Sequence, residues 1–219
     1  MRLLIHGMQS SGATSFARAL AERPDCLAMV DIANNFAAPR ITTTRDFVAK
    51  TVITTAYPLA VHVERFRPDK IVLLLRDPRA NYRSLLTKNY RHGSGLMPEK
   101  FLLLDQLFAE RGRFDAVIHY EDFATRAPAV RETMAGLGWP LEEAYYRFTR
   151  GYDELLRSLW EEEPRIQDTM DTVFGNSRGH EVTNFSSGAE TDADSERAVA
   201  DLCPRLLAHY RQREEEISR

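Results

Sequence analysis

The sequence predicts an α/β fold of the P-loop type, with an open parallel sheet of about five strands, helices on both faces and a helical C-terminal third. Short apolar runs alternate with helical patterns over the first two thirds of the chain, an order typical of a parallel sheet covered by helices. The run from Ile71 to Leu75 has five consecutive apolar residues, as expected for a strand buried on both faces. After residue 127 the pattern is helical.

The strands are predicted, in chain order, at residues 3–6, 27–30, 47–54, 71–75 and 116–120. Helical patterns lie between them near residues 13–23, 56–66, 78–90 and 98–111. Open parallel sheets bind ligands beyond the carboxyl ends of their strands. We therefore expect the functional residues in the loops that follow the strands.

The last third of the chain is predicted to form helices near residues 127–137, 141–160 and 194–214. A stretch near residues 176–194 is rich in Gly, Ser and acidic residues, which indicates a solvated or mobile loop, although loops of this length also act as lids. The sequence thus predicts one domain over residues 1–219. Its α/β cofactor-binding core covers 1–126, and its helical C-terminal part covers 127–219.

The composition is that of a globular protein. The chain has 219 residues, 43% of them hydrophobic, and its 29 Lys and Arg against 32 Asp and Glu give a net charge of -3. Such a balance excludes a disordered tail and argues against a protein that coats nucleic acid. No apolar stretch approaches the ~20 residues of a transmembrane helix. Because there are only two cysteines, far apart, we expect a soluble, cytoplasmic protein without a disulfide framework.

The first predicted strand runs into a loop of glycines and small hydroxyl residues, Gly7 to Ser15. Backbone N–H groups of such a loop, together with the N-terminus of the next helix, form an anion-binding cradle. Gly7 and Gly12 have the spacing of a nucleoside-triphosphatase loop, but Ala13 stands where the lysine of that loop should be. The missing lysine argues against a kinase, and no metal site is predicted. The alternative is a tight turn without a ligand.

A second motif follows the strongest predicted strand. Arg76 stands at the carboxyl end of this strand, and Pro78 begins a helix on which Ser84 lies two turns along. An arginine at the end of a buried strand can hold an anion, to which the serine hydroxyl can add a hydrogen bond. The segment therefore predicts a second anion-binding element beside the loop.

These segments resemble the two cofactor motifs of sulfotransferases, the enzymes that use 3′-phosphoadenosine 5′-phosphosulfate (PAPS). The similar segments are the loop Ser10–Thr14 and the stretch from Arg76 to Ser84. Residues 120–123, Tyr-Glu-Asp-Phe, resemble the family's Tyr-Glu-Asp-Leu segment, and order and spacing agree over residues 2–140. The resemblance implies a PAPS-dependent sulfotransferase with PAP (3′,5′-bisphosphoadenosine) as its nucleotide product and no metal.

The resemblance also implies roles for individual residues. Arg76 and Ser84 would hold the 3′-phosphate, Tyr120 would lie near the adenine, and Arg178 would close over the 3′-phosphate. The 5′-phosphosulfate would be held by the loop residues Ser10, Ser11, Gly12, Ala13, Thr14 and Ser15. Family members place a Lys or Arg where this chain has Ser10, a departure that bears on the rate.

The catalytic base is expected at Asp31. The cytosolic small-molecule branch of the family uses a His in a Lys-Thr-His triplet, and here the triplet is Lys50-Thr51-Val52. The tyrosylprotein branch and bacterial relatives have a Glu just after the second strand, a position that corresponds to Asp31. Lys50 would stabilise the charge on the leaving oxygen. The structural alternatives are a turn-capping role for Asp31 and a surface position for Lys50.

Three functions are compatible with these residues: a sulfotransferase, a catalytically weak or inactive nucleotide-binding relative, and a P-loop small-molecule kinase, which Ala13 disfavours. The acceptor would bear a hydroxyl (or amine) on a carbohydrate, a lipid-linked glycan or a small molecule. Its pocket is expected from residues 32–46, the 89–100 loop and the C-terminal helices. The sequence says nothing about oligomeric state.

Overall fold

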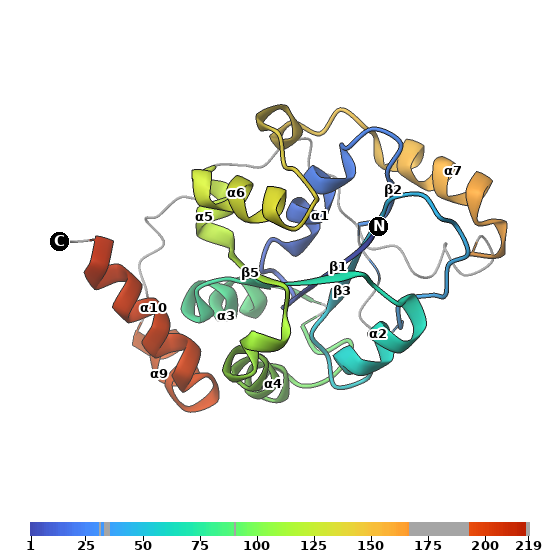
Figure 1. Cartoon of the computed structure of the whole chain (residues 1–219). Coiled ribbons are helices and arrows are strands. Elements are labelled where there is room, and N and C mark those ends of the chain that lie inside the picture. Colours follow the sequence, from blue (N-terminus) through green and yellow to red (C-terminus); the bar gives the residue numbers. More distant parts are fainter. Residues whose placement is uncertain (31, 33–35, 90, 167–192, 218–219) are drawn as a thin grey trace.

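A computed structural model of the chain describes residues 1–30, 32, 36–89, 91–166 and 193–217. The described residues form a five-stranded sheet with all neighbouring strands parallel, in the order β2-β3-β1-β4-β5 (Figure 1). The strands are β1 (Arg2–Gly7), β2 (Leu27–Met29), β3 (Phe47–Val52), β4 (Lys70–Leu75) and β5 (Ala116–His119). The predicted open parallel sheet is thus confirmed.

The central strand β1 pairs with β3 on one side and β4 on the other, so that Ile5 lies between Lys50 and Val72. Residues 3–5 are fully buried, which explains the uninterrupted apolar run. The chain leaves β1 toward β2 on one side of the sheet and leaves β4 toward β5 on the other. A ligand crevice is expected between the loops that follow two such strands.

Helices cover both faces of the sheet (Figure 1). One face packs against α1 (Ala13–Ala21), α5 (Tyr120–Ala124) and α6 (Pro128–Gly136). The other packs against α4 (Met97–Ala109), α9 (Ala193–Leu202) and α10 (Pro204–Ile217), together with α3 (Pro78–Leu86). A third apolar cluster joins β2 and β3 to α2 (Leu59–Phe66) and α7 (Tyr152–Glu162). Three 3₁₀ turns, η1 (Arg111–Arg113), η2 (Glu143–Tyr146) and η3 (Pro164–Ile166), complete the described elements.

Two predicted helices are each divided in the structure. The helix expected at 141–160 consists of η2 and α7. Between them, the Arg150 guanidinium donates to the carbonyls of Ala21 and Cys26, 2.7 Å from each. These bonds hold the segment between η2 and α7 in an extended conformation. The helix expected at 194–214 is broken at Pro204, which cannot donate a backbone hydrogen bond to the preceding turn and starts α10 instead.

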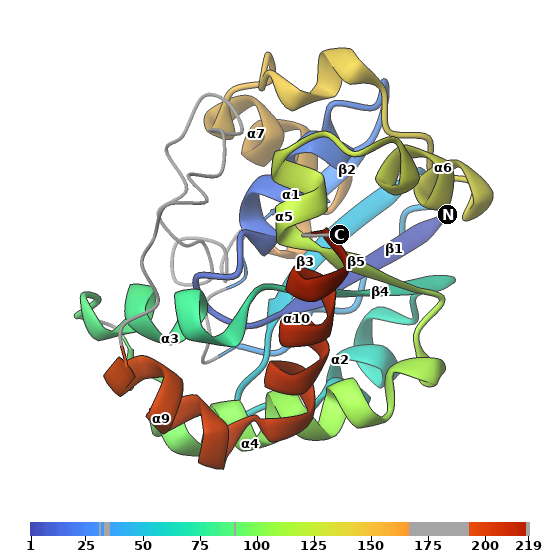
Figure 2. The same ribbon diagram turned by 90° about the vertical axis from the view of Figure 1, so that its left-hand side faces the viewer.

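The last helix is attached to the rest of the molecule by polar contacts. Figure 2 shows α10 running from α4 toward α5. At its beginning, Asp105 of α4 accepts the backbone N–H groups of Arg205 and Leu206 at 2.9 and 3.1 Å. At its end, Arg213 donates to both carboxylate oxygens of Asp122 on α5. The C-terminal helix is therefore fixed at both ends.

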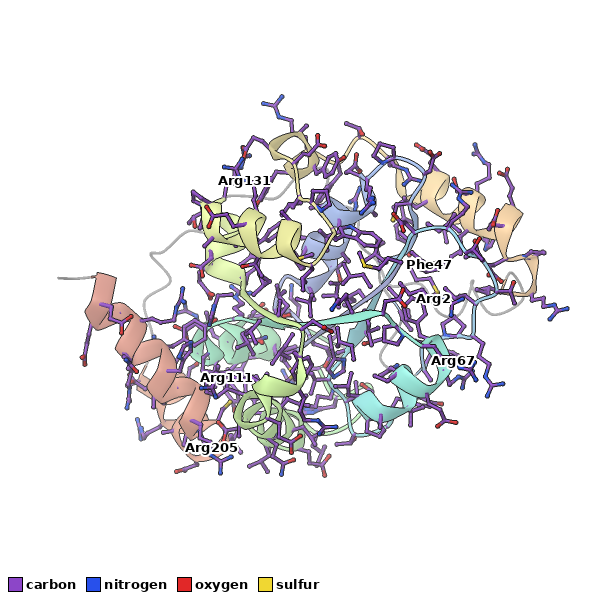
Figure 3. All side chains as sticks on the ribbon, viewed as in Figure 1. Arg2, Phe47, Arg67, Arg111, Arg131 and Arg205 are labelled. Atoms are coloured by element: carbon purple, nitrogen blue, oxygen red, sulfur yellow. The ribbon has the colours of Figure 1, made fainter. Side chains whose placement is uncertain are left out.

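The surface is charged and the interior is mostly apolar. Arg131 and Arg205 project outward, whereas Phe47 lies inside the fold (Figure 3). Within the described ranges no helix has the length and apolarity needed to cross a membrane.

Candidate functional site

The loop after β1 has the geometry of an anion-binding cradle. Ser10 and Gly12 both adopt left-handed backbone conformations, with φ of 59° and 86°. The Ser11 N–H bonds back to the Met8 carbonyl at 3.2 Å, which closes the turn. Gly12 is the N-cap of α1 and contributes no side chain to the first turn of that helix. The backbone N–H groups at this N-terminus therefore have no side-chain cap from the N-cap residue.

Arg76 lies against this loop, as the sequence predicts for the end of β4. Its guanidinium donates to the Ser10 carbonyl at 2.7 Å, and the Arg76 Cζ stands 5.1 Å from the centre of the Tyr120 ring. The Tyr120 ring covers Gly12, because a Cβ added to Gly12 would lie only 2.1 Å from a ring carbon. The structure thus brings the loop, Arg76 and Tyr120 together at the carboxyl edge of the sheet.

Three buried polar atoms around the loop have no hydrogen-bond partner: Ser11 Oγ, Arg76 Nε and Asn81 Oδ1. Nearly all buried polar groups in native proteins are satisfied, so unsatisfied ones call for an explanation. The Ser11 hydroxyl and the Arg76 Nε–H are donors, and Arg76 is positively charged. A bound anion supplies the acceptors that both groups lack, so these residues fit a phosphate-bearing ligand.

The turn that carries Arg76 is held by carboxylates. Asp77 caps α3 by accepting the Arg79 N–H at 2.8 Å, and the buried Arg79 guanidinium bridges Asp77 and Glu214 of α10. Glu121 accepts the Asp77 N–H at 2.9 Å and the Tyr210 hydroxyl at 3.0 Å, and burial raises the pKa of its carboxyl. Glu121 is thus a positioning residue for the Arg76 turn.

The remaining predicted cofactor residues are distributed as follows. Thr14 and Ser15 lie half-buried on the first turn of α1, next to the buried Ala13. Ser84 is half-buried on α3, and among the described residues no hydrogen bond joins its hydroxyl to Arg76. Arg178 lies outside the described residues.

Of the two predicted catalytic residues, one can be located. Lys50 lies within β3, opposite Ile5 of β1, and is 5% exposed. The surface alternative for Lys50 is therefore wrong. Asp31 lies outside the described residues, although the N–H of the next residue, Ile32, donates to the Lys50 carbonyl at 3.4 Å.

His6 and His62 are buried and His119 is half-buried, and the loss of hydration is the main cause of their lowered pKa values. The pKa of His6 is lowered to about 3, and the pKa values of His62 and His119 to about 4. A side chain with so low a pKa holds an abstracted proton poorly at neutral pH. These residues agree with the expectation of packed histidines rather than bases, whereas His92 is exposed.

Sequence reasoning did not single out the polar residues behind the loop. The Asn81 amide of α3 donates to the Gln9 carbonyl at 2.6 Å, and Lys100 of α4 donates to Gln9 Oε1 at 2.7 Å. Asn81 lies within the Arg76–Ser84 motif, and this position in the sequence could have indicated that it contacts the loop. Lys100 stands 91 positions from Gln9, and no local pattern marks it.

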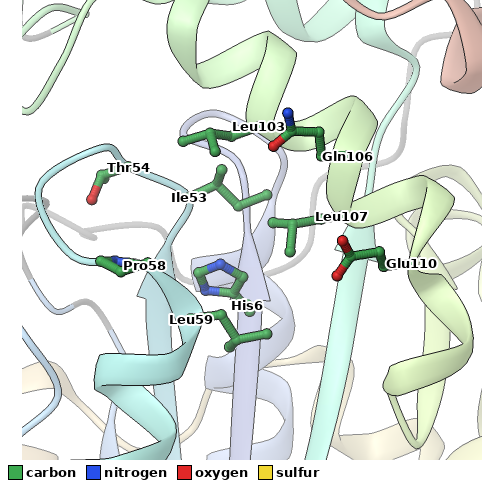
Figure 4. Close-up of a pocket in the computed structure, with 9 residues that line it drawn as sticks. All are labelled: His6, Ile53, Thr54, Pro58, Leu59, Leu103, Gln106, Leu107 and Glu110. Atoms are coloured by element: carbon green, nitrogen blue, oxygen red, sulfur yellow. The ribbon is translucent and has the colours of Figure 1, made fainter.

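A pocket of about 140 Å³ lies near the carboxyl ends of β1 and β3, between α2 and α4 (Figure 4). Its walls are aliphatic, with His6, Thr54, Gln106 and Glu110 as polar groups. Ile53, which lines it, donates its N–H to the Gly7 carbonyl at 3.0 Å, so the pocket adjoins the start of the loop. The segments expected to line the acceptor pocket are different ones and include residues 33–35 and 90, outside the described residues.

No family model and no curated protein matches the chain. Several solved structures resemble its fold. A mouse sulfotransferase complexed with PAP is 13% identical and covers 92% of this chain and 82% of its own, with a TM-score of 0.47. Retinol dehydratase in complex with androsterone and inactive cofactor PAP is 14% identical and covers 94% of this chain and 80% of its own, with a TM-score of 0.48. A sulfotransferase from Alicyclobacillus acidocaldarius is 16% identical and covers 77% of this chain and 95% of its own, with a TM-score of 0.37.

Proposed function

We propose that the chain is a sulfotransferase that moves a sulfuryl group from PAPS to a hydroxyl (or amine) of an acceptor and releases PAP. The observation that supports this function best is the pair of unsatisfied donors, Ser11 Oγ and Arg76 Nε, beside the uncapped N-terminus of α1. They belong to loops after two adjacent strands, β1 and β4. Anion-binding groups on two loops suit a nucleotide that carries phosphates at both its 3′ and 5′ positions.

The loop itself favours sulfuryl over phosphoryl transfer. A P-loop kinase needs a lysine that reaches the outer phosphates, and Ala13 occupies that position. A sulfuryl group carries less negative charge than a γ-phosphoryl group. Backbone N–H groups and Arg76 are therefore a better match for PAPS than for ATP.

The transfer is in line. The acceptor oxygen forms a bond to sulfur while the bond from sulfur to the 5′-phosphate oxygen breaks. Asp31 takes the acceptor's proton, and Lys50 stabilises the negative charge that develops on the leaving phosphate oxygen. The N–H groups of the first turn of α1 act on the same charge. Arg76 and Ser84 bind the 3′-phosphate, and Tyr120 packs beside the adenine.

We assign a small acceptor to the pocket between α2 and α4. Its aliphatic walls suit an apolar body, and its four polar residues can hydrogen-bond a hydroxyl group. Through Ile53 and Gly7 the pocket adjoins the loop that would hold the sulfuryl group. The assignment favours a small aliphatic or aromatic alcohol over a glycan.

Two measurements test the proposed function. Calorimetry should show PAP binding without magnesium and weaker binding of ATP with magnesium. Purified protein with radiolabelled PAPS and pooled alcohols, phenols, amines and sugars should transfer label to at least one pool. No PAP binding would refute the nucleotide site, and preferential binding of Mg-ATP would favour a kinase.

The runner-up is a nucleotide-binding relative that has lost turnover. Ser10 and Val52 favour it, because each replaces a residue that family members use near the reacting group. PAP binding with no transfer to any acceptor pool would support this function.

A further inference from the structure

A lysine lies fully buried behind the phosphate loop. Lys100 of α4 has 0% of its side chain exposed. Its ammonium donates to Gln9 Oε1 at 2.7 Å and to the Arg91 carbonyl at 3.0 Å. Gln9 is the loop residue immediately before Ser10, and its own carbonyl accepts from the buried Asn81 at 2.6 Å. A single side chain therefore separates the buried ammonium from the loop.

This ammonium has no carboxylate partner among the described residues. Both of its hydrogen bonds are to neutral oxygens, and the ion pairs of the described chain do not include it. Removing an ammonium from water is costly unless an opposite charge compensates. Burial accordingly lowers the pKa of Lys100 to about 8. A buried cation that donates only to neutral oxygens can be compensated by the negative charge of a bound ligand.

We propose that Lys100 supplies, from α4, the positive charge that the phosphate loop lacks at Ser10 and Ala13. This inference rests on the proposed function and deepens it. Lys100 is a positioning residue: it fixes the Gln9 carboxamide and, through it, the loop conformation. Its charge acts across the water-excluded cluster on the 5′-phosphate, where a buried charge is screened far less than an exposed one.

The charge of Lys100 can be tested by titration, and the groups that surround its ammonium are the following. Glu99, on the same helix, opposes the lowering of the pKa. The loop and α3 contribute the uncharged amides of Gln9 and Asn81. Arg91 offers its carbonyl, while its guanidinium donates to Leu86 and contacts His92. Asp105, farther along α4, is occupied by the N-terminus of α10.

The test compares two ligands that differ only at the 5′ position. Calorimetry measures the affinity of the unaltered chain and of Lys100→Met for PAP and for adenosine 3′-phosphate at pH 7.5. Lys70→Met is the control, because Lys70 pairs with Asp115 at the opposite end of the sheet. Lys100→Met should bind PAP about ten-fold or more weakly and adenosine 3′-phosphate with nearly unchanged affinity. The control should change neither.

A pH series on the unaltered chain tests the charge of Lys100 without changing the shape of its side chain. Above pH 7.5 the phosphates of both ligands are fully ionised, so a loss of affinity reports on the protein. The unaltered chain should lose PAP affinity between pH 7.5 and 9.5 and keep most of its affinity for adenosine 3′-phosphate. A folded Lys100→Met variant should lack this difference.

The inference and the proposed function fail differently. If the unaltered chain binds no PAP, the proposed function is wrong and the role of Lys100 falls with it. If PAP binds but its affinity does not fall more steeply with pH than that of adenosine 3′-phosphate, the role of Lys100 is wrong. A folded Lys100→Met variant with the parent's PAP affinity would contradict that role as well, and neither result touches the proposed function.

Discussion

The guanidinium of Arg76 donates to the backbone carbonyl of Ser10 at 2.7 Å, so the residue that follows β4 is bonded directly to the loop that follows β1. The bond fixes the separation between the two segments that the proposed function assigns to the phosphates of the nucleotide. It also leaves Arg76 Nε buried without a hydrogen-bond partner.

Replacing Arg76 should therefore weaken nucleotide binding. A hydrogen bond to a charged group contributes ~1.5–3 kcal/mol, so Arg76→Ala should lower PAP affinity about ten-fold or more in calorimetry. Arg113→Ala is a matched control, because Arg113 is 72% exposed on η1 and pairs only with Glu110 among the described residues. Equal PAP affinities for the parent and a folded Arg76→Ala would remove the basis of the two-phosphate site.

Substitutions of Asp31 and Lys50 should lower the rate of sulfate transfer and leave the affinity for PAP nearly unchanged. In the proposed reaction both residues act mainly on the transition state, and interactions made only there lower turnover while leaving ground-state affinity nearly intact. Asp31→Asn and Lys50→Ala should keep PAP affinity within a few-fold of the parent and lose about a hundred-fold or more in sulfate transfer. Asp31→Glu should be the best tolerated change. Timed assays with labelled PAPS measure the rates, and a near-parental Asp31→Asn rate would move the base elsewhere, with His92 as the next candidate.

Gly12 should not tolerate a side chain. Its φ of 86° is strained for other residues, and a Cβ would overlap the Tyr120 ring. Gly12→Ala should lower the free energy of unfolding in urea by about 1–3 kcal/mol and weaken PAP binding. Gly136→Ala, at an open helical position, should be neutral or stabilising by about 0.5–1 kcal/mol. Tyr120→Ala should recover part of the Gly12→Ala loss, and purely additive effects would show that the ring does not cause it.

Stability should fall below pH 6.5. The pKa values of His6, His62 and His119 are lowered to about 3, 4 and 4 in the folded chain, whereas unfolded histidines titrate near 6.5. Between these values the unfolded chain binds more protons, so the free energy of unfolding decreases as the pH falls from 6.5 toward 4. Urea denaturation at pH 7.5 and 5.0 measures the difference, and equal values would contradict the lowered pKa values of these three histidines.

One of these histidines offers a matched pair of variants. His62 Nδ1 accepts the Ala38 N–H at 3.0 Å, which requires the neutral ring. His62→Asn keeps an acceptor in reach and removes the titration, so the loss of stability between pH 7.5 and 5.0 should become smaller. His92→Gln, at an exposed position, should leave that loss unchanged.

Filling the pocket should affect the acceptor alone. Leu107 is a half-buried wall residue on α4. Leu107→Trp should raise the KM for a small alcohol acceptor several-fold and leave PAP affinity unchanged. Leu102→Trp, exposed on the same helix, is the control. An unaltered KM for Leu107→Trp would place the acceptor outside this pocket.

Local patterns predicted much of the fold, because the signals lie within single elements. The apolar run of β4 and the proline at the start of α3 each marked its element, and the described sheet is parallel as expected. The division of the helix at 194–214 could have been predicted from Pro204. The interruption between η2 and α7 could not, because it depends on contacts of Arg150 with residues far along the chain.

The residues of the candidate site likewise fall into those that local sequence patterns predict and those that they do not. Arg76, Tyr120 and the loop follow strands, so the parallel topology brings them to one edge. Lys100 and Glu214 reach the site from helices whose docking no local pattern encodes. Lys100 meets Gln9, and Glu214 meets Arg79, only because the helices that carry them pack against the rest of the fold.

The ion pair between Arg79 and Glu214 joins residues 135 positions apart. Closing so long a segment costs chain entropy, which the contacts of the docked α10 must compensate. The sheet and α3 can assemble from segments closer in sequence, but the Asp77 turn gains its last supports only when α10 docks. The conformation of the turn that carries Arg76 therefore depends on the docking of the C-terminal helix and not on the sheet alone.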